Sequence, residues 1–251
     1  MSFSSVVNIY ANAFKLLTKS FLSVLPFSLL YIMIEYLINK YIPFTLTETG
    51  EPLSSFANPL LSLLIMLLCF NCILYGIYQK HHQLKFNYVH VILNGLYRFF
   101  PALTALFLIL LPIIVISIAL NYISGIFETL SITDSSKLHF MAIVMIGILF
   151  LFFIGMITWL IMSLYFYTTP VIVVIKKETA INGLKHSWQL LHGHWFRTFL
   201  IVFMLIVAST LLQMGLFLLI GNLSAQLIEL IMLPLVACVM ILYHEQLEKE
   251  N

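Results

Sequence analysis

Three histidines lie close together in the segment HSWQLLHGHW, residues 186–195. Imidazole is the commonest metal ligand, and a helical zinc pair places two of them four residues apart on one face. His186 and His192 are six residues apart, about 240° around a helix, so their side chains diverge. His192 and His194 flank Gly193 and could chelate together, but no Cys, Asp or aligned third ligand is nearby. We therefore expect no metal ion at this segment, and neither a metal ion nor a cofactor elsewhere in the chain.

Two carboxylates within apolar runs are stronger candidates for chemistry, because ionisable residues inside membrane spans are rare and often functional. Glu35 and Glu229 lie at similar distances from the ends of their runs, and we expect them at a similar depth. Together they could share a proton, bind a cation or line a polar pocket. Asn71 and Gln213, whose amides are typical of hydrogen bonds between membrane helices, belong to the same candidate pocket. Alternatively, each carboxylate is near enough to the membrane surface to reach headgroups or Lys40.

The composition excludes an ordinary soluble domain. Apolar residues make up 62% of the 251 residues and charged residues only 9%, whereas soluble domains carry about 25% charged residues. The mean hydropathy is +1.06. A net charge of +2, with basic residues scattered singly, argues against nucleic acid as a partner. Since no catalytic motif is visible, we expect a protein that is not an enzyme.

The apolar residues come in runs long enough to cross a membrane. A bilayer core of about 30 Å requires roughly 20 apolar residues of helix. The sequence therefore predicts an all-α, polytopic membrane protein with one integral membrane domain over residues 1–251. We expect six transmembrane helices, at 21–42, 59–78, 101–123, 140–169, 199–220 and 225–243.

Basic residues gather on one side of these six spans. Lys80, Lys176 and Lys177 lie there, together with most of the other lysines and arginines. The opposite side carries mainly acidic residues: Glu48, Glu51, Glu128 and Asp134, against Lys40 and Lys137. Because basic loops stay in the cytoplasm, we expect both termini there and the candidate pocket at Glu35 and Glu229 to face outward.

Three segments on the basic side show the spacing of a helix with one apolar stripe. The stripes are Val6, Ile9, Ala13 and Leu17; Phe86, Val89, Leu93, Leu96 and Phe100; and Ile181, Leu184, Trp188, Leu191 and Trp195. We expect three amphipathic helices at headgroup depth, with Gly193 ending the third. The basic residues among those expected at the membrane interface should favour anionic phospholipid headgroups. The interface residues are Lys15, Lys19, Lys85, Arg98, Lys185, Trp188, Trp195 and Arg197.

Each of these segments leads into a span through a basic residue and an aromatic, in KSF, RFF and RTF. Each following span then returns near a Leu-Tyr pair. This order predicts three copies of one unit, an interfacial helix followed by a helical hairpin, over residues 1–80, 81–175 and 176–251. The same residues also serve as ordinary membrane anchors, which is the alternative explanation.

The order of features resembles the YciC-type bacterial inner-membrane proteins, a family related to the membrane domains attached to some glycerophosphodiesterases. The N-terminal segment MSFSSVVNIY precedes six spans, and Pro170, VIVVI and ETAINGLKHSWQLLHGHWFRTF follow the fourth. The residue-level match is concentrated at positions 163–199. The resemblance implies a multi-pass inner-membrane protein linked to the cell envelope. It implies no catalytic residues, and no phosphodiesterase domain is present.

Our leading expectation is therefore a non-enzymatic inner-membrane protein that supports envelope integrity or handles lipids or small molecules. The alternative is a transporter or permease for a small molecule or ion, with its polar pocket at Glu35 and Glu229. An intramembrane enzyme is a third and weaker alternative, because no nucleophile and base occur together.

Overall fold

The computed structural model describes residues 3–41, 53–129, 135–221 and 223–250, and these residues are helical apart from short turns. Six helices are long and apolar enough to cross a membrane: α1 (Phe3–Tyr41), α2 (Leu53–His81), α4 (Phe99–Thr129), α5 (Ser135–Tyr165), α8 (Trp195–Ile220) and α9 (Leu223–Glu250). Three shorter helices connect them: α3 (Tyr88–Tyr97), α6 (Thr169–Val174) and α7 (Ala180–Leu191). The predicted all-helical, multi-pass class is confirmed.

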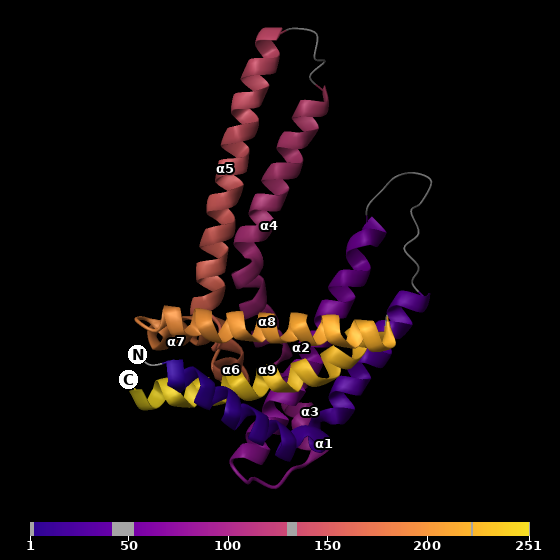
Figure 1. Ribbon diagram of the computed structural model, residues 1–251, viewed down its shortest axis with the longest axis vertical. Helices are drawn as coiled ribbons and strands as arrows, with labels where there is room; N and C mark the ends of the chain where they lie inside the picture. The colour runs from indigo at the N-terminus through magenta and orange to yellow at the C-terminus, as the bar shows by residue number, and fades with distance from the viewer. Residues whose placement is uncertain (1–2, 42–52, 130–134, 222, 251) are drawn as a thin grey trace.

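The long helices form three hairpins, α1–α2, α4–α5 and α8–α9, which fan out from a common base (Figure 1). The base consists of the first half of α1, the ends of α2, α5 and α9, the starts of α4 and α8, and the short helices α3, α6 and α7. The start of α1 and the end of α9 lie side by side there, because α1 and α9 pack against each other in opposite directions (Figure 1).

The fourth predicted span is too long at its C-terminal end. Residues 140–169 were expected as one helix, but α5 ends at Tyr165, and a turn leads into α6. Pro170 sits in the first turn of α6, where its missing N–H costs nothing. Within a longer α5 the same residue would remove a backbone hydrogen bond and break or kink the helix. The apolar VIVVI segment thus forms a separate buried helix.

The N-terminal segment and the first span form one continuous helix, α1, which contains Pro26. The stripe that was expected to face lipid is instead buried: Val6, Ile9, Ala13 and Leu17 are each at most 8% exposed. They belong to the main hydrophobic core, together with residues of α2 and α9. The first half of α1 is therefore a core element of the base.

The other two expected stripes lie mainly on exposed faces. In α3, Val89 and Leu93 are exposed, whereas the opposite face buries Val91 and Gly95. In α7, Ile181 and Trp188 are exposed, while Leu191 is fully buried. Both helices begin with a side-chain cap: Asn87 accepts from the N–H of Val89, and Thr179 from that of Asn182.

The outer hairpins expose apolar side chains nearly all around. In the most apolar stretch of α5, within Ile146–Tyr165, none of the described side chains is buried by the protein, and the corresponding stretches of α4 and α8 are only 11% buried. By contrast, 44% of that stretch in α2 and 39% in α9 are buried. Surfaces this apolar need a lipid environment, because water would leave several hundred Å² of apolar area unfavourably hydrated.

Candidate functional site

Glu35 and Glu229 come from the outer halves of two neighbouring helices, α1 and α9. The structure brings the two carboxyl groups into hydrogen-bonding contact, and the Tyr31 hydroxyl interacts with both residues. Both glutamates are partly buried, and Tyr31 is 5% exposed. The two side chains meet because α1 and α9 run antiparallel, so that positions equally far from the base face each other. This carboxylate pair can share a proton or bind a cation.

Glu229 also lines an open cavity of about 590 Å³. Gln213 and Ser209 of α8 are its other polar residues, and its remaining walls are apolar side chains from α2, α4, α8 and α9, together with Pro170. Asn71 does not line this cavity. It is fully buried, and neither its side-chain oxygen nor its nitrogen has a hydrogen-bond partner among the described residues. Three of the four predicted pocket residues are thus adjacent, and Asn71 lies apart.

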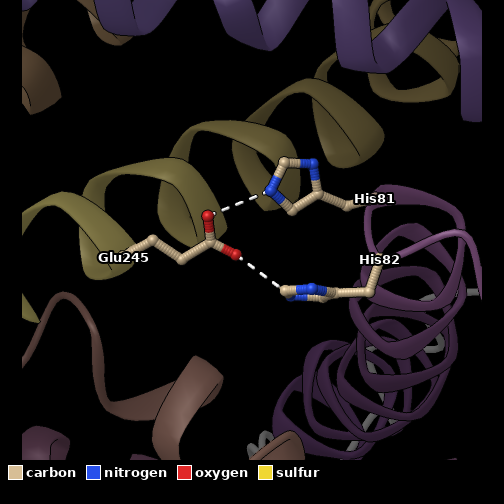
Figure 2. Close-up of side chains that lie close together, drawn as sticks. All are labelled: His81, His82 and Glu245. Carbon is tan, nitrogen blue, oxygen red and sulfur yellow. Dashed lines mark hydrogen bonds and ion pairs between the residues drawn. The ribbon is translucent and has the colours of Figure 1, made fainter.

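A second polar cluster lies in the base, where the last turn of α2 meets the last turns of α9. His81 and His82 both point toward Glu245 (Figure 2). The Nε2 atom of His81 lies 3.0 Å from Oε2 of Glu245, and Nε2 of His82 lies 3.2 Å from Oε1. Glu245 is 26% exposed, so the carboxylate is only partly open to solvent.

Next to this cluster, four lysines from three helices line an open cavity of about 640 Å³. We call it the lysine cavity: Lys15 and Lys19 of α1, Lys80 of α2 and Lys249 of α9. His81 and Glu245 are part of its wall. The four lysines converge because each lies near the base end of its helix, and α1 packs against both α2 and α9.

The remaining residues expected at the membrane interface have different surroundings. Lys85 and Lys185 are exposed. Arg98 donates to the carbonyl oxygen of Lys177 at 2.9 Å, and this bond joins the start of α4 to the segment before α7. Trp188 is 40% exposed and stacks on Tyr165, with 4.2 Å between ring centroids.

Trp195 is 53% exposed at the start of α8, but its neighbour Arg197 is only 4% exposed. The guanidinium of Arg197 pairs with Glu250 and lies over the ring of Tyr243. Arg197 therefore faces the protein interior, in contrast to the headgroup contact expected from the sequence.

The histidines of residues 186–195 remain apart. Nδ1 of His186 lies 2.9 Å from Glu178, whereas His192 caps the end of α7 and His194 precedes α8. Gly193 follows the cap with φ +86°, a left-handed conformation that agrees with its expected role in ending the helix. The potential metal-ligand cluster among the described residues is the one at His81, His82 and Glu245.

Sequence reasoning missed this cluster, although a signal was present. KHHQ ends the second predicted span and HEQ follows the sixth, and both segments were assigned to the cytoplasmic side. Histidine and glutamate at the same ends of two spans can meet if those spans are neighbours. Which spans are neighbours is a tertiary property, and the helix patterns do not contain it.

No protein-family model, no curated protein and no solved structure matches this chain.

Proposed function

We propose that this chain is a non-enzymatic, multi-pass membrane protein that handles phospholipid by holding anionic headgroups at its base. The lysine cavity is the observation that carries this proposal. Four ammonium groups from three helices line one open space of about 640 Å³, and Glu245 is the acidic residue in its wall. Lysine is a common phosphate ligand, and clusters of basic residues beside membrane spans attract anionic lipids.

The apolar surfaces of the hairpins support a lipid rather than a soluble anion as the ligand. A second open cavity, of about 550 Å³, lies between α5 and α8 and is lined mostly by apolar and aromatic side chains, among them Leu160, Trp195 and Phe199. Such a groove suits acyl chains. The exposed apolar faces of α3 and α7 add a surface at the base that suits the boundary between headgroups and acyl chains.

The charge distribution supports a cytoplasmic base. The lysines of the lysine cavity, together with Arg98, Lys176 and Lys185, belong to the base, and the positive-inside rule assigns such an end to the cytoplasm. Both termini are then cytoplasmic. With the resemblance to YciC-type proteins, this orientation supports the bacterial inner membrane as the location and envelope integrity as the wider role.

The element order also supports the proposed threefold repeat. A capped short helix precedes a hairpin twice, as α3 before α4–α5 and as α7 before α8–α9. In the first copy the corresponding N-terminal segment and the first span form one continuous helix, α1. The repeat unit is thus an interfacial helix followed by a hairpin, and the first copy has moved its helix into the core.

Lipid binding can be tested on the purified protein in mild detergent. Native mass spectrometry measures the occupancy of added phosphatidylglycerol and of added phosphatidylcholine. We expect a preference for phosphatidylglycerol that the double variant Lys15→Gln/Lys249→Gln weakens about 10- to 30-fold, since each basic residue contributes roughly 1 kcal/mol. Inorganic phosphate, added as a competitor, separates recognition of the phosphate from binding of the acyl chains.

The matched control is Lys85→Gln/Lys185→Gln, which removes the same charge from exposed positions outside the cavity. We expect the control to change the affinity less than about threefold. Equal losses of affinity in the two double variants would mean that the whole base attracts the lipid diffusely and that the lysine cavity is not the binding site. No preference between the two lipids would overturn the proposal.

A second candidate function is transport of a small molecule or ion. The specific observation in its favour is the contact between Glu35 and Glu229 beside the apolar cavity that contains Gln213. A carboxyl pair inside a membrane span can take up and release a proton while a substrate occupies the neighbouring space. Under the proposed orientation, this pair lies in the outer half of the membrane.

Transport is tested by proton flux and by uptake of a panel of small solutes in proteoliposomes. Glu35→Gln and Glu229→Gln should each abolish the flux, whereas Glu178→Gln, a carboxyl change in the base, should leave it unchanged. Flux that survives both pair variants would remove the carboxylates from the mechanism. Absence of flux in the wild-type protein would leave lipid handling as the function.

A further inference from the structure

The cluster of His81, His82 and Glu245 ties together two helix ends that are far apart in the sequence. One nitrogen of each imidazole and one carboxylate oxygen lie within 4.8 Å of one another. In a tetrahedral zinc site the bonds to N and O are about 2.0–2.2 Å long, which places neighbouring donor atoms roughly 3.3 Å apart. The separations of 3.0 and 3.2 Å between the histidine nitrogens and the Glu245 oxygens are already close to that value.

Hydrogen bonds alone do not satisfy this cluster. His81 forms a hydrogen bond with Oε2 of Glu245. Nε2 of His82 lies near Oε1 but outside hydrogen-bond geometry, and this buried oxygen has no hydrogen-bond partner among the described residues. Because a buried acceptor without a hydrogen bond is destabilising, the site favours a ligand that takes up its lone pair.

A further imidazole beside the cluster also lacks a partner. His244, next to Glu245 in α9, is 3% exposed, and neither ring nitrogen forms a hydrogen bond with the described residues. Its Nε2 lies 3.7 Å from Glu248, beyond hydrogen-bond distance. His244 lines the same open cavity of about 520 Å³ as His82 and Glu245. His244 therefore adds to the wall of this space a buried imidazole that forms no hydrogen bond with the described residues.

The neighbouring positive charges are compatible with a bound cation. The ammonium group of Lys80 lies over the ring of Phe86, 5.2 Å from its centroid, and Lys176 is paired with Glu248. The lysine cavity lies on the other side of Glu245. An anion in that cavity can complete the coordination of an ion held at the cluster. The negative charge of the anion offsets the positive charges of the metal ion and of the lysines.

We propose that His81, His82 and Glu245 form a binding site for a divalent transition-metal ion, with zinc preferred, whose fourth position is open to solvent or an anion. Two imidazoles and one carboxylate are a borderline donor set that suits zinc better than magnesium or calcium. Three protein ligands leave one position free. The ion clamps the end of α2 to the end of α9. This assignment does not rest on lipid binding, because its measurements use the metal alone.

The test uses full-length protein purified in detergent through a tag without histidine and stripped with a chelator. Calorimetric titration with Zn²⁺ and the visible absorption of bound Co²⁺ report stoichiometry and coordination. We expect one ion per chain and a rise in the unfolding temperature that grows with metal concentration. His81→Gln/His82→Gln should weaken the affinity at least about tenfold and abolish the metal-dependent rise.

The matched control is His186→Gln/His192→Gln, which removes two histidines from the same base outside the cluster. The control should bind one ion with wild-type affinity. If the His81/His82 variant fails to fold, Glu245→Gln replaces it, since the amide keeps a hydrogen-bond acceptor for His81 and is a poor metal ligand. Wild-type protein without a stoichiometric ion, or equal losses in variant and control, would overturn the site.

Discussion

Arg197 and Glu250 join the first turn of α8 to the last turn of α9. Nη1 of Arg197 donates to both carboxylate oxygens of Glu250, at 3.0 and 2.8 Å. The arginine side chain is 4% exposed and the glutamate 34%. The positive charge of Arg197 is thereby placed inside the base. The ion pair holds α8 and α9 together at the end of their hairpin that lies opposite the connecting turn.

Loss of this ion pair should destabilise the protein. We expect Glu250→Gln to lower the free energy of unfolding by about 1–3 kcal/mol, because it leaves the buried guanidinium without its counter-charge. The value falls below that for a fully buried pair because Glu250 is partly solvated. Each kcal/mol lowers the unfolding temperature in detergent by about 2–4 °C. Glu248→Gln, which breaks the more exposed pair with Lys176, should cost less than about 1 kcal/mol; an equal loss would contradict this account.

Gly95 sets the distance between α3 and α2. A Cβ atom at this position would lie 2.4 Å from Sγ of Cys72, so Gly95→Ala should cost about 1–3 kcal/mol through overpacking. Gly215→Ala in α8 meets open space and should be neutral or stabilising by up to about 1 kcal/mol, as expected for a helical glycine. Removing the obstructing sulfur in Gly95→Ala/Cys72→Ala should restore part of the lost unfolding temperature. A stable Gly95→Ala protein would mean that α3 does not pack as described.

Tyr167 should make the protein sensitive to alkaline pH. Burial raises the pKa of Tyr167 above its ordinary value of 10.0, and its hydroxyl has no hydrogen-bond partner among the described residues. The folded state therefore keeps the proton that the unfolded chain loses, so stability is full below pH ~10 and falls as the pH rises further. The unfolding temperature of Tyr167→Phe should fall less between pH 9 and pH 11 than that of wild type. Tyr97→Phe, at a ring that is 75% exposed, should follow wild type.

Trp188 and Leu191 separate the two roles of α7. Leu191 is fully buried, so Leu191→Asp should prevent folding both with and without added phospholipid. Trp188 is 40% exposed and stacks on Tyr165, so Trp188→Asp should fold but lose contact with lipid. We expect the unfolding temperature of Trp188→Asp to depend less on added phospholipid, and Trp188→Phe to restore the dependence. The same dependence in wild type and Trp188→Asp would mean that α7 does not contact the membrane surface. Gln189→Asp, at the neighbouring position, is the matched control.

The class of the protein and most helix positions follow from the sequence. Apolar runs of about 20 residues can satisfy their backbone polar groups inside a bilayer only as helices, so the six spans are local properties of the chain. The end of α7 was also predictable from the local sequence, because Gly193 supplies the left-handed residue that terminates a helix. The error at the fourth span arose where hydropathy continues through Tyr165 to Val174, although Pro170 begins a new helix.

Tertiary structure decided which faces and residues meet. The stripes at Val6–Leu17 and at Val89–Leu93 have the same spacing, yet one is buried against α9 and the other exposed. A helical pattern indicates that a face is apolar, but the neighbouring helix determines whether protein or lipid covers it. For the same reason Glu35 and Glu229 were recognisable as unusual residues, whereas Glu245 became a candidate ligand only through the packing of α9 against the end of α2. Coordination requires donor atoms about 3 Å apart, and only the folded chain brings positions 81 and 245 to that distance.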